Sequence, residues 1–232
     1  MGSSYTLGDI RDKIETDLDL KEETMISETE LNANINEAIR EAEAEVHSLN
    51  EDYFLTTFPL PVTQGTSLYS LPTDIYATKI RAIIWNNGTE VYRINKLINK
   101  SYQFEEITLT NTFSTSLRYR YILLNSLTSG QQISFTPPMR DTLSSAVTIY
   151  YIRDARQLVD DDDVLDIPEG YNFILAYAKA KCLAKENMGQ IPPGIAAEVE
   201  HQRQLMRDLL CEKIPDDDNE IEQDLSHYEE AT

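Results

Sequence analysis

The clearest pattern of hydrophobic and polar residues lies between Ser27 and Asn50. The apolar residues recur every three or four positions, at Leu31, Ile35, Ala38, Ile39, Ala42, Val46 and Leu49. At about 3.6 residues per turn these positions share one stripe, which predicts an amphipathic helix with one face against a core. Ser27 followed three residues later by Glu30 predicts a capping box at the helix start. We therefore expect a long helix that anchors a helical unit.

Three further segments have helical patterns. Residues 6–18 begin with Thr6 and Asp9 at capping-box spacing and carry a narrow apolar edge. Residues 168–189 are apolar nearly all round the helix axis, which predicts burial on more than one face. Residues 192–213 carry one apolar stripe, made of Ile195, Val199, Met206, Leu209 and Leu210. The predicted core of the helical unit contains Leu31, Ile35, Ile39, Val46, Ile174 and Ala178.

Between the two pairs of helices the pattern changes to short strands. Turn signals such as Asn86-Asn87-Gly88 separate segments rich in β-branched and aromatic residues. The candidate strands are 53–63, 67–71, 79–85, 89–94, 107–110, 117–124, 132–135 and 146–152. Pro59 and Pro61 confine the first of them to the edge of a sheet, because proline cannot donate to a strand ladder. The region predicts an antiparallel β-sandwich or small barrel.

These elements predict an α+β fold. Two helices from each end of the chain form a four-helix module, residues 1–50 and 165–214, around an inserted β domain, residues 51–164. Residues 215–232 form an extended C-terminal tail. From Ile214 onward the chain has eight acidic residues, no lysine or arginine and few large apolar groups, which predicts that the tail is flexible on its own.

The net charge of the chain argues against some classes of function. The chain has 20 basic and 40 acidic residues, a net charge of −20, so nucleic acid and anionic lipid repel it unless its cations gather on one face. No apolar stretch approaches the roughly 20 residues that span a bilayer, and no membrane association is expected. Cys182 and Cys211 are read as reduced thiols rather than a disulfide.

Two acidic clusters are candidates for chemistry. Glu37, Glu41 and Glu45 form a row on one helix face, which predicts an acidic surface toward solvent, DNA or a neighbouring subunit. A catalytic carboxylate pair would need environments that separate the two pKa values, and an exposed row gives none. The run Asp160 to Asp163 predicts a solvated loop, with Ca²⁺ binding as the alternative. Neither cluster predicts an enzyme, and no catalytic residue, metal ligand or cofactor site is expected.

Three stretches of the sequence resemble a known family. They are TLGDIRDKIETDL with ISETELNANINEAIREAEAEV, then LYSLPTDIYATKIRAIIW, and then DIP leading into ILAYAKA. Together they cover most of residues 6–188. They resemble the head-to-tail adaptors of tailed bacteriophages, also called head-completion or connector proteins, especially those of short-tailed phages.

The resemblance implies a structural virion protein without cofactors. Such adaptors form a homo-oligomeric ring, typically of twelve copies, that docks on the portal and binds a tail tube or nozzle protein, with DNA passing through its lumen. They belong to the neck of the virion and assemble in the host cytoplasm. A helix that is apolar all round suits a ring in which a neighbour covers it. In this chain Ile221, Leu225 and Tyr228 of the tail would contact the portal.

Two other classes stay open at this stage. One is a carbohydrate- or calcium-binding β module, because Trp85 and many of the thirteen tyrosines lie in the strand region. The other is a tail-associated enzyme that degrades the cell wall.

Overall fold

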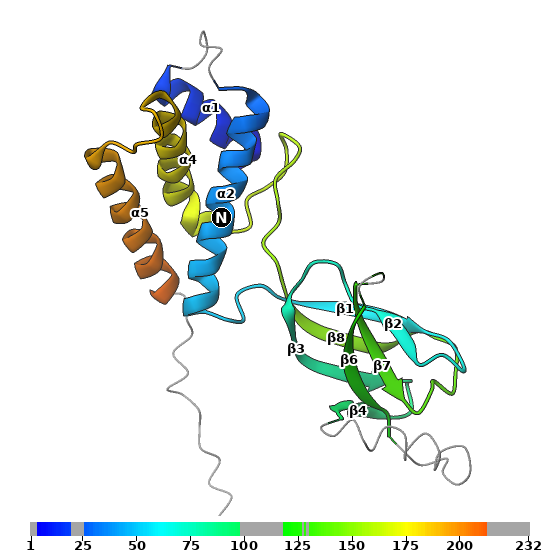
Figure 1. Cartoon of the computed structure of the whole chain (residues 1–232). Coiled ribbons are helices and arrows are strands. Elements are labelled where there is room, and N and C mark those ends of the chain that lie inside the picture. Colours follow the sequence, from blue (N-terminus) through cyan, green and yellow to red (C-terminus); the bar gives the residue numbers. More distant parts are fainter. Residues whose placement is uncertain (1–3, 20–25, 98–117, 127, 129, 213–232) are drawn as a thin grey trace, which may run out of the picture. The chain divides into compact units, whose positions relative to one another are not determined.

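The chain divides into two compact units (Figure 1). The structure, a computed structural model, describes residues 4–19, 26–97, 118–126, 128 and 130–212. One unit comprises Met1–Asn50 and Gln157–Thr232, and the other comprises Glu51–Arg156. We call them the helical unit and the β unit. The β unit is inserted into the sequence of the helical unit, which resumes at residue 157.

The described part of the helical unit contains four α-helices. They are α1 (Leu7–Leu18), α2 (Glu28–Leu49), α4 (Tyr171–Glu186) and α5 (Pro193–Glu212), with a 3-10 turn, η2 (Pro168–Gly170), before α4. Helix α4 packs against α1, α2 and α5. Its buried residues are Phe173, Ile174, Leu175, Ala178, Ala180 and Cys182. The prediction of burial on several faces is confirmed, but helices of the same chain cover those faces, so this pattern is no argument for a neighbouring subunit.

The helix starts follow the sequence signals with two differences. At α1 the capping box is complete, with Thr6 and Asp9 each accepting from the other's backbone N–H. At α2 the Ser27 hydroxyl accepts from the backbone N–H of Glu30, whereas the Glu30 carboxylate accepts from Lys185 Nζ at 2.6 Å. Pro168 opens the short 3-10 turn rather than the α-helix itself.

The β unit has two four-stranded sheets among its described residues. The strands are β1 (Leu55–Val62), β2 (Leu68–Ser70), β3 (Ile75–Asn86), β4 (Val91–Arg93), β5 (Asn95–Lys96), β6 (Arg120–Ser126), β7 (Gly130–Thr136) and β8 (Leu143–Arg153). The sheet orders are β1-β8-β3-β4 and β2-β7-β6-β5. Strand β1 is an edge strand, as its prolines predict. The β5–β6 pair is parallel, so the prediction of a wholly antiparallel domain is wrong there. The candidate strand 107–110 lies outside the described residues.

Both sheets contribute to one hydrophobic core. Val147 and Ile149 of β8 come from the first sheet, and Ile133 and Phe135 of β7 come from the second. Trp85 of β3 belongs to the same cluster and is 2% exposed. Two sheets that share their apolar side chains in this way have the layered arrangement that alternating strands predict.

Strand β3 contains a backbone irregularity that can be tested. Ala77 and Thr78 have φ of 46° and 59°, within the register shift between Ile75 and Ile80. A left-handed conformation is costly for a β-branched residue and free of steric cost for glycine. We expect Thr78→Gly to raise the free energy of unfolding of the β unit by about 0.5–1 kcal/mol in urea titrations. The control Thr56→Gly, in a regular strand, should lower the free energy of unfolding. A loss of stability in Thr78→Gly would contradict the left-handed backbone conformation of Thr78.

Candidate functional site

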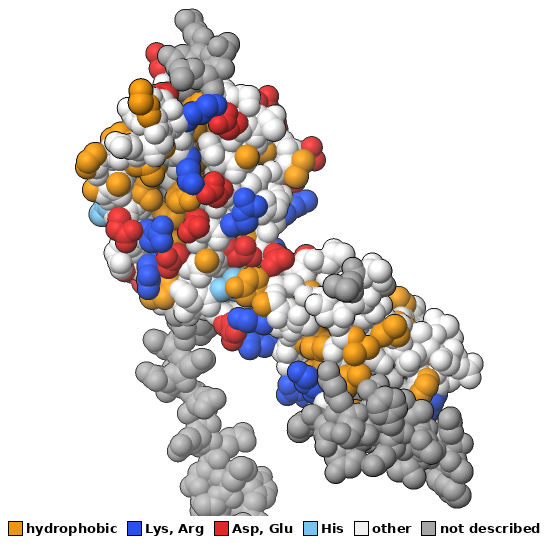
Figure 2. All heavy atoms as spheres, viewed as in Figure 1, with side chains coloured by type: hydrophobic (Ala, Val, Ile, Leu, Met, Phe, Trp, Pro, Cys, Tyr) orange, Lys and Arg blue, Asp and Glu red, His pale blue; other side chains and the backbone are white. Residues whose placement is uncertain are grey.

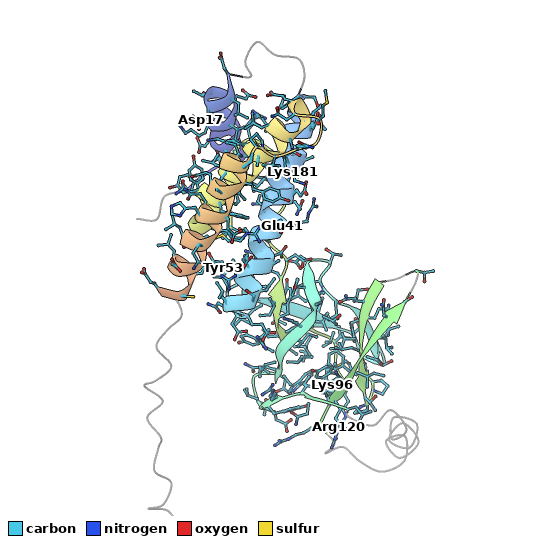
Figure 3. All side chains as sticks on the ribbon, turned by 60° about the vertical axis from the view of Figure 1, so that its left-hand side comes forward. Asp17, Glu41, Tyr53, Lys96, Arg120 and Lys181 are labelled. Atoms are coloured by element: carbon cyan, nitrogen blue, oxygen red, sulfur yellow. The ribbon has the colours of Figure 1, made fainter. Side chains whose placement is uncertain are left out.

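Ion pairs join α4 to the N-terminal helices. Lys181 Nζ lies 2.7 Å from Glu37 Oε1, and Lys185 Nζ lies 2.6 Å from Glu30 Oε2, both on α2. Lys179 pairs with Asp17 of α1. Figure 3 shows Asp17 and Lys181 on the helical unit. The three lysines thus connect segments more than 140 positions apart in the sequence.

The predicted acidic row on α2 is divided by these pairs. Glu37 accepts hydrogen bonds from Lys181 and from the Tyr177 hydroxyl, and the Lys181 bond holds its pKa below the ordinary value. Glu45 Oε1 and Oε2 lie 3.2 Å from Arg203 and Arg207 of α5. Glu41 is the exposed member of the row, and Glu37 and Glu45 are partly buried. Cations far along the sequence thus pair with the two ends of the row, and its role as an acidic surface toward DNA or a neighbouring subunit stays a prediction.

The run of aspartates contacts the start of α1. The backbone N–H groups of Leu7 and Gly8 donate to the carbonyl oxygens of Asp163 and Asp161 at 3.0 and 2.9 Å. The Arg11 guanidinium also binds the Asp161 carboxylate at 2.9 Å. The first backbone N–H groups of a helix have no partner within the helix, and these carbonyl oxygens accept hydrogen bonds from two of them. The segment is thus a structural connection, and among the described residues no group of three or more His, Cys, Asp or Glu is placed to hold a metal ion.

Asn36 is a structural residue that the sequence pattern did not identify. Its Nδ2 donates to the carbonyl oxygen of Leu158 at 2.8 Å, and its Oδ1 accepts from the Leu158 N–H at 2.9 Å. This reciprocal pair fastens the segment after the β unit to α2. An asparagine off the apolar stripe gave no local signal of that role, since its partner lies 122 positions away.

Helix α5 presents a mixed apolar and acidic surface. Of its predicted stripe, Met206 and Leu210 are buried, while Leu209 is 48% exposed. Leu205 is 42% exposed, and Asp208 and Glu212 are exposed as well. Positions 205, 208, 209 and 212 fall on one side of a helix. We call these four residues the α5 stripe.

Basic side chains gather at one edge of the β unit. Arg93 ends β4, Lys96 belongs to β5, and Arg118 and Arg120 lie at the start of β6; all four are exposed. We call them the basic edge. The Arg118 guanidinium lies over the Tyr92 ring at 5.3 Å, and Arg93 Nη2 donates to the Arg81 carbonyl at 2.8 Å. Figure 3 shows Lys96 and Arg120 at the same end of the unit.

Glu51, at the beginning of the β unit, permits a direct pH test. Hydrogen bonds from Lys79 and Arg81 lower its pKa from 4.5 to about 2. A lowered folded-state pKa means that the stabilisation is present above pH 4.5 and is lost as the pH falls toward 2. Carboxylate NMR titration should give this low pKa, and Lys79→Met should raise it. An unshifted pKa of 4.5 in the unmodified protein would contradict the ion pair.

The remaining predicted site residues divide into two sets. The six predicted core residues, Leu31, Ile35, Ile39, Val46, Ile174 and Ala178, are all buried. The predicted portal contacts Ile221, Leu225 and Tyr228 lie outside the described residues. Within the described helices, none is long and apolar enough to span a bilayer.

Comparison with known proteins identifies the family. The model of the SU10 adaptor protein family matches residues 5–222, which include the whole β unit and most of the helical unit. No curated protein matches the chain. A match over this length covers the helical pairs and the inserted β unit together, in agreement with the resemblance seen in the sequence. The chain therefore belongs to the SU10 adaptor protein family and is a structural, head-to-tail adaptor component of a phage virion.

Proposed function

We propose that the protein forms a ring, of twelve copies, that docks on the portal and binds a tail tube or nozzle protein on its other side. The observation that carries the proposal is the family match across residues 5–222. The family is structural, and its members associate with portal and tail components. In this proposal the protein occupies the neck of the virion and assembles in the host cytoplasm.

The lumen of the ring would let genomic DNA pass without holding it. A net charge of −20 supports this role, because phosphates are repelled by an acidic wall and are held by a basic one. Glu41 is the member of the α2 row that is available for such a wall, since Glu37 and Glu45 are paired with cations. The basic edge of the β unit is expected to face away from the DNA path.

The contacts within the helical unit support a structural role as an adaptor. Ion pairs fasten together helices that come from opposite ends of the chain, and the Asn36–Leu158 hydrogen bonds fasten the segment after the β unit to α2. The inserted β unit has its own hydrophobic core, so each unit could bind a different partner. A connector between portal and tail needs two such separate binding surfaces.

The acidic C-terminal segment is the proposed portal contact. Deleting Pro215 to Thr232 removes Ile221, Leu225 and Tyr228 while leaving every described helix and strand in place. We expect the truncated protein to keep its melting temperature and to bind purified portal rings at least about tenfold more weakly. Substituting only the three apolar residues by serine should reproduce the loss. Unchanged portal affinity of both variants would overturn this assignment.

A further inference from the structure

The two units carry very different net charges. Residues 51–156 contain ten basic and eight acidic side chains, a net charge of +2, so the rest of a chain with net charge −20 carries −22. On the face drawn in Figure 2, acidic and basic side chains are interspersed over the helical unit, whereas the charged side chains on the lower part of the β unit are basic. The chain therefore offers one strongly acidic partner and one locally basic partner for electrostatic association.

The basic edge lies where both sheets end. Among the described strands, β4 is the last of one sheet and β5 is the last of the other, and only the buried Ile94 separates the two in sequence. Val91, on the same strand as Arg93, is 67% exposed. Within the described residues this edge therefore combines cations from three strand segments with an exposed apolar side chain. Basic residues on edge strands also deter uncontrolled strand pairing, and the two roles are compatible.

The α5 stripe has the complementary character. Leu205 and Leu209 supply exposed apolar surface, and Asp208 and Glu212 supply negative charge. The arginines of α5 do not neutralise the stripe, because Arg203 and Arg207 are paired with Glu45 of α2. Asp208 Oδ1 accepts from the neutral amide of Gln204 at 2.8 Å, which leaves its charge in place.

We propose that the basic edge of one copy docks on the α5 stripe of the next copy. The inference rests on the proposed ring and names the surfaces that close it. Two different patches on the same chain make a heterologous contact, and repetition of a heterologous contact generates a ring when the rotation closes. Opposite charges set the register of the contact, and the leucines with Val91 supply its apolar centre.

Charge reversal tests the contact. We expect Lys96→Glu/Arg120→Glu, and separately Asp208→Lys/Glu212→Lys, to weaken subunit association at least about tenfold by mass photometry. The four substitutions combined should restore association to within about threefold, because the charges are exchanged across the contact. Wild-type rings should also dissociate as NaCl is raised. Arg40→Glu/Arg156→Glu, which makes the same charge change outside both surfaces, should leave association unchanged.

Several outcomes would overturn the inference. Rings that form and bind portal normally in both reversal variants would refute the contact while leaving the proposed function standing. Failure of the wild-type chain to form rings, alone or on portal, would instead refute the proposed function. If Lys96→Glu/Arg120→Glu abolishes binding to a duplex DNA probe and leaves ring assembly intact, the edge is a nucleic-acid surface.

A second measurement does not depend on charge-reversed variants folding. Cys211 on α5 is exposed and Cys182 is buried. In the assembled protein with Lys96→Cys, Leu209→Cys on the α5 stripe and Cys211→Ser, mild oxidation should link the stripe thiol of one copy to the edge thiol of the next and give a ladder of multimers on a denaturing gel. Thr56→Cys, on a strand away from the basic edge, is the matched control. An absence of ladders from assembled Lys96→Cys/Leu209→Cys/Cys211→Ser rings would contradict the contact.

Discussion

Replacing Ile35 by aspartate is expected to unfold the helical unit. Ile35 is completely buried on α2, and an isolated carboxylate at that position costs several kcal/mol through lost burial and desolvation. The loss is comparable to the whole stability of a typical domain. Far-ultraviolet circular dichroism during urea titration should show the helical signal lost at much lower urea, or already absent in buffer.

The conservative control at the same site separates packing from charge. Ile35→Val removes one methylene and should cost only about 0.5–1.5 kcal/mol. The β unit has a separate core, so the near-ultraviolet signal of its buried Trp85 should persist in Ile35→Asp. A melting curve of Ile35→Asp that matched the unmodified protein would show that the α2 stripe is not core.

Asn36→Ala should give the second largest loss of stability. The substitution removes two hydrogen bonds and leaves the N–H and carbonyl of Leu158 without their side-chain partner, which together should cost about 2–3 kcal/mol. Because the chain re-enters the helical unit at Gln157, next to Leu158, the change should also expose this segment to protease. Urea titration and limited proteolysis provide the two measurements.

Neighbouring variants make this test specific. Asn36→Asp keeps the acceptor for the Leu158 N–H but has no hydrogen to donate to the Leu158 carbonyl. The loss of stability in Asn36→Asp should be smaller than in Asn36→Ala only if the site tolerates a carboxylate. Asn34→Ala is the matched control. The Asn34 amide donates a long, weak hydrogen bond to Cys182 Sγ at 3.8 Å, so its loss should cost less than about 1 kcal/mol. Equal losses in Asn34→Ala and Asn36→Ala would refute the assigned role.

Local signals predicted the elements of this protein well. The recurrence of apolar residues every three or four positions and the Ser27 cap predicted α2, and the structure confirms a helix at Glu28–Leu49. Pro59 and Pro61 placed β1 at a sheet edge, because the missing N–H groups exclude a central position. Family membership was predicted from residue patterns before, within and after the β unit and is confirmed by the match over residues 5–222.

Long-range polar contacts could not be predicted from the sequence. The row of Glu37, Glu41 and Glu45 looked solvated because its cationic partners, Lys181, Arg203 and Arg207, lie more than 140 positions away. The aspartate run looked like a free loop because its contacts are with the backbone and the Arg11 side chain of α1, about 150 positions earlier in the sequence. Leu209 fits the apolar periodicity of α5 and is nevertheless exposed. The periodicity alone does not show which side of the helix packs against another element.

The most direct test of the account is the mass of the purified protein, alone and mixed with portal rings. We predict that the mixture contains portal rings whose mass is raised by about twelve times 26.5 kDa, in a single discrete step. Mass photometry resolves an added ring from partial occupancy. Portal rings of unchanged mass, at protein concentrations well above those of the virion proteins in an infected cell, would contradict the proposal that this chain is a ring docked on the portal.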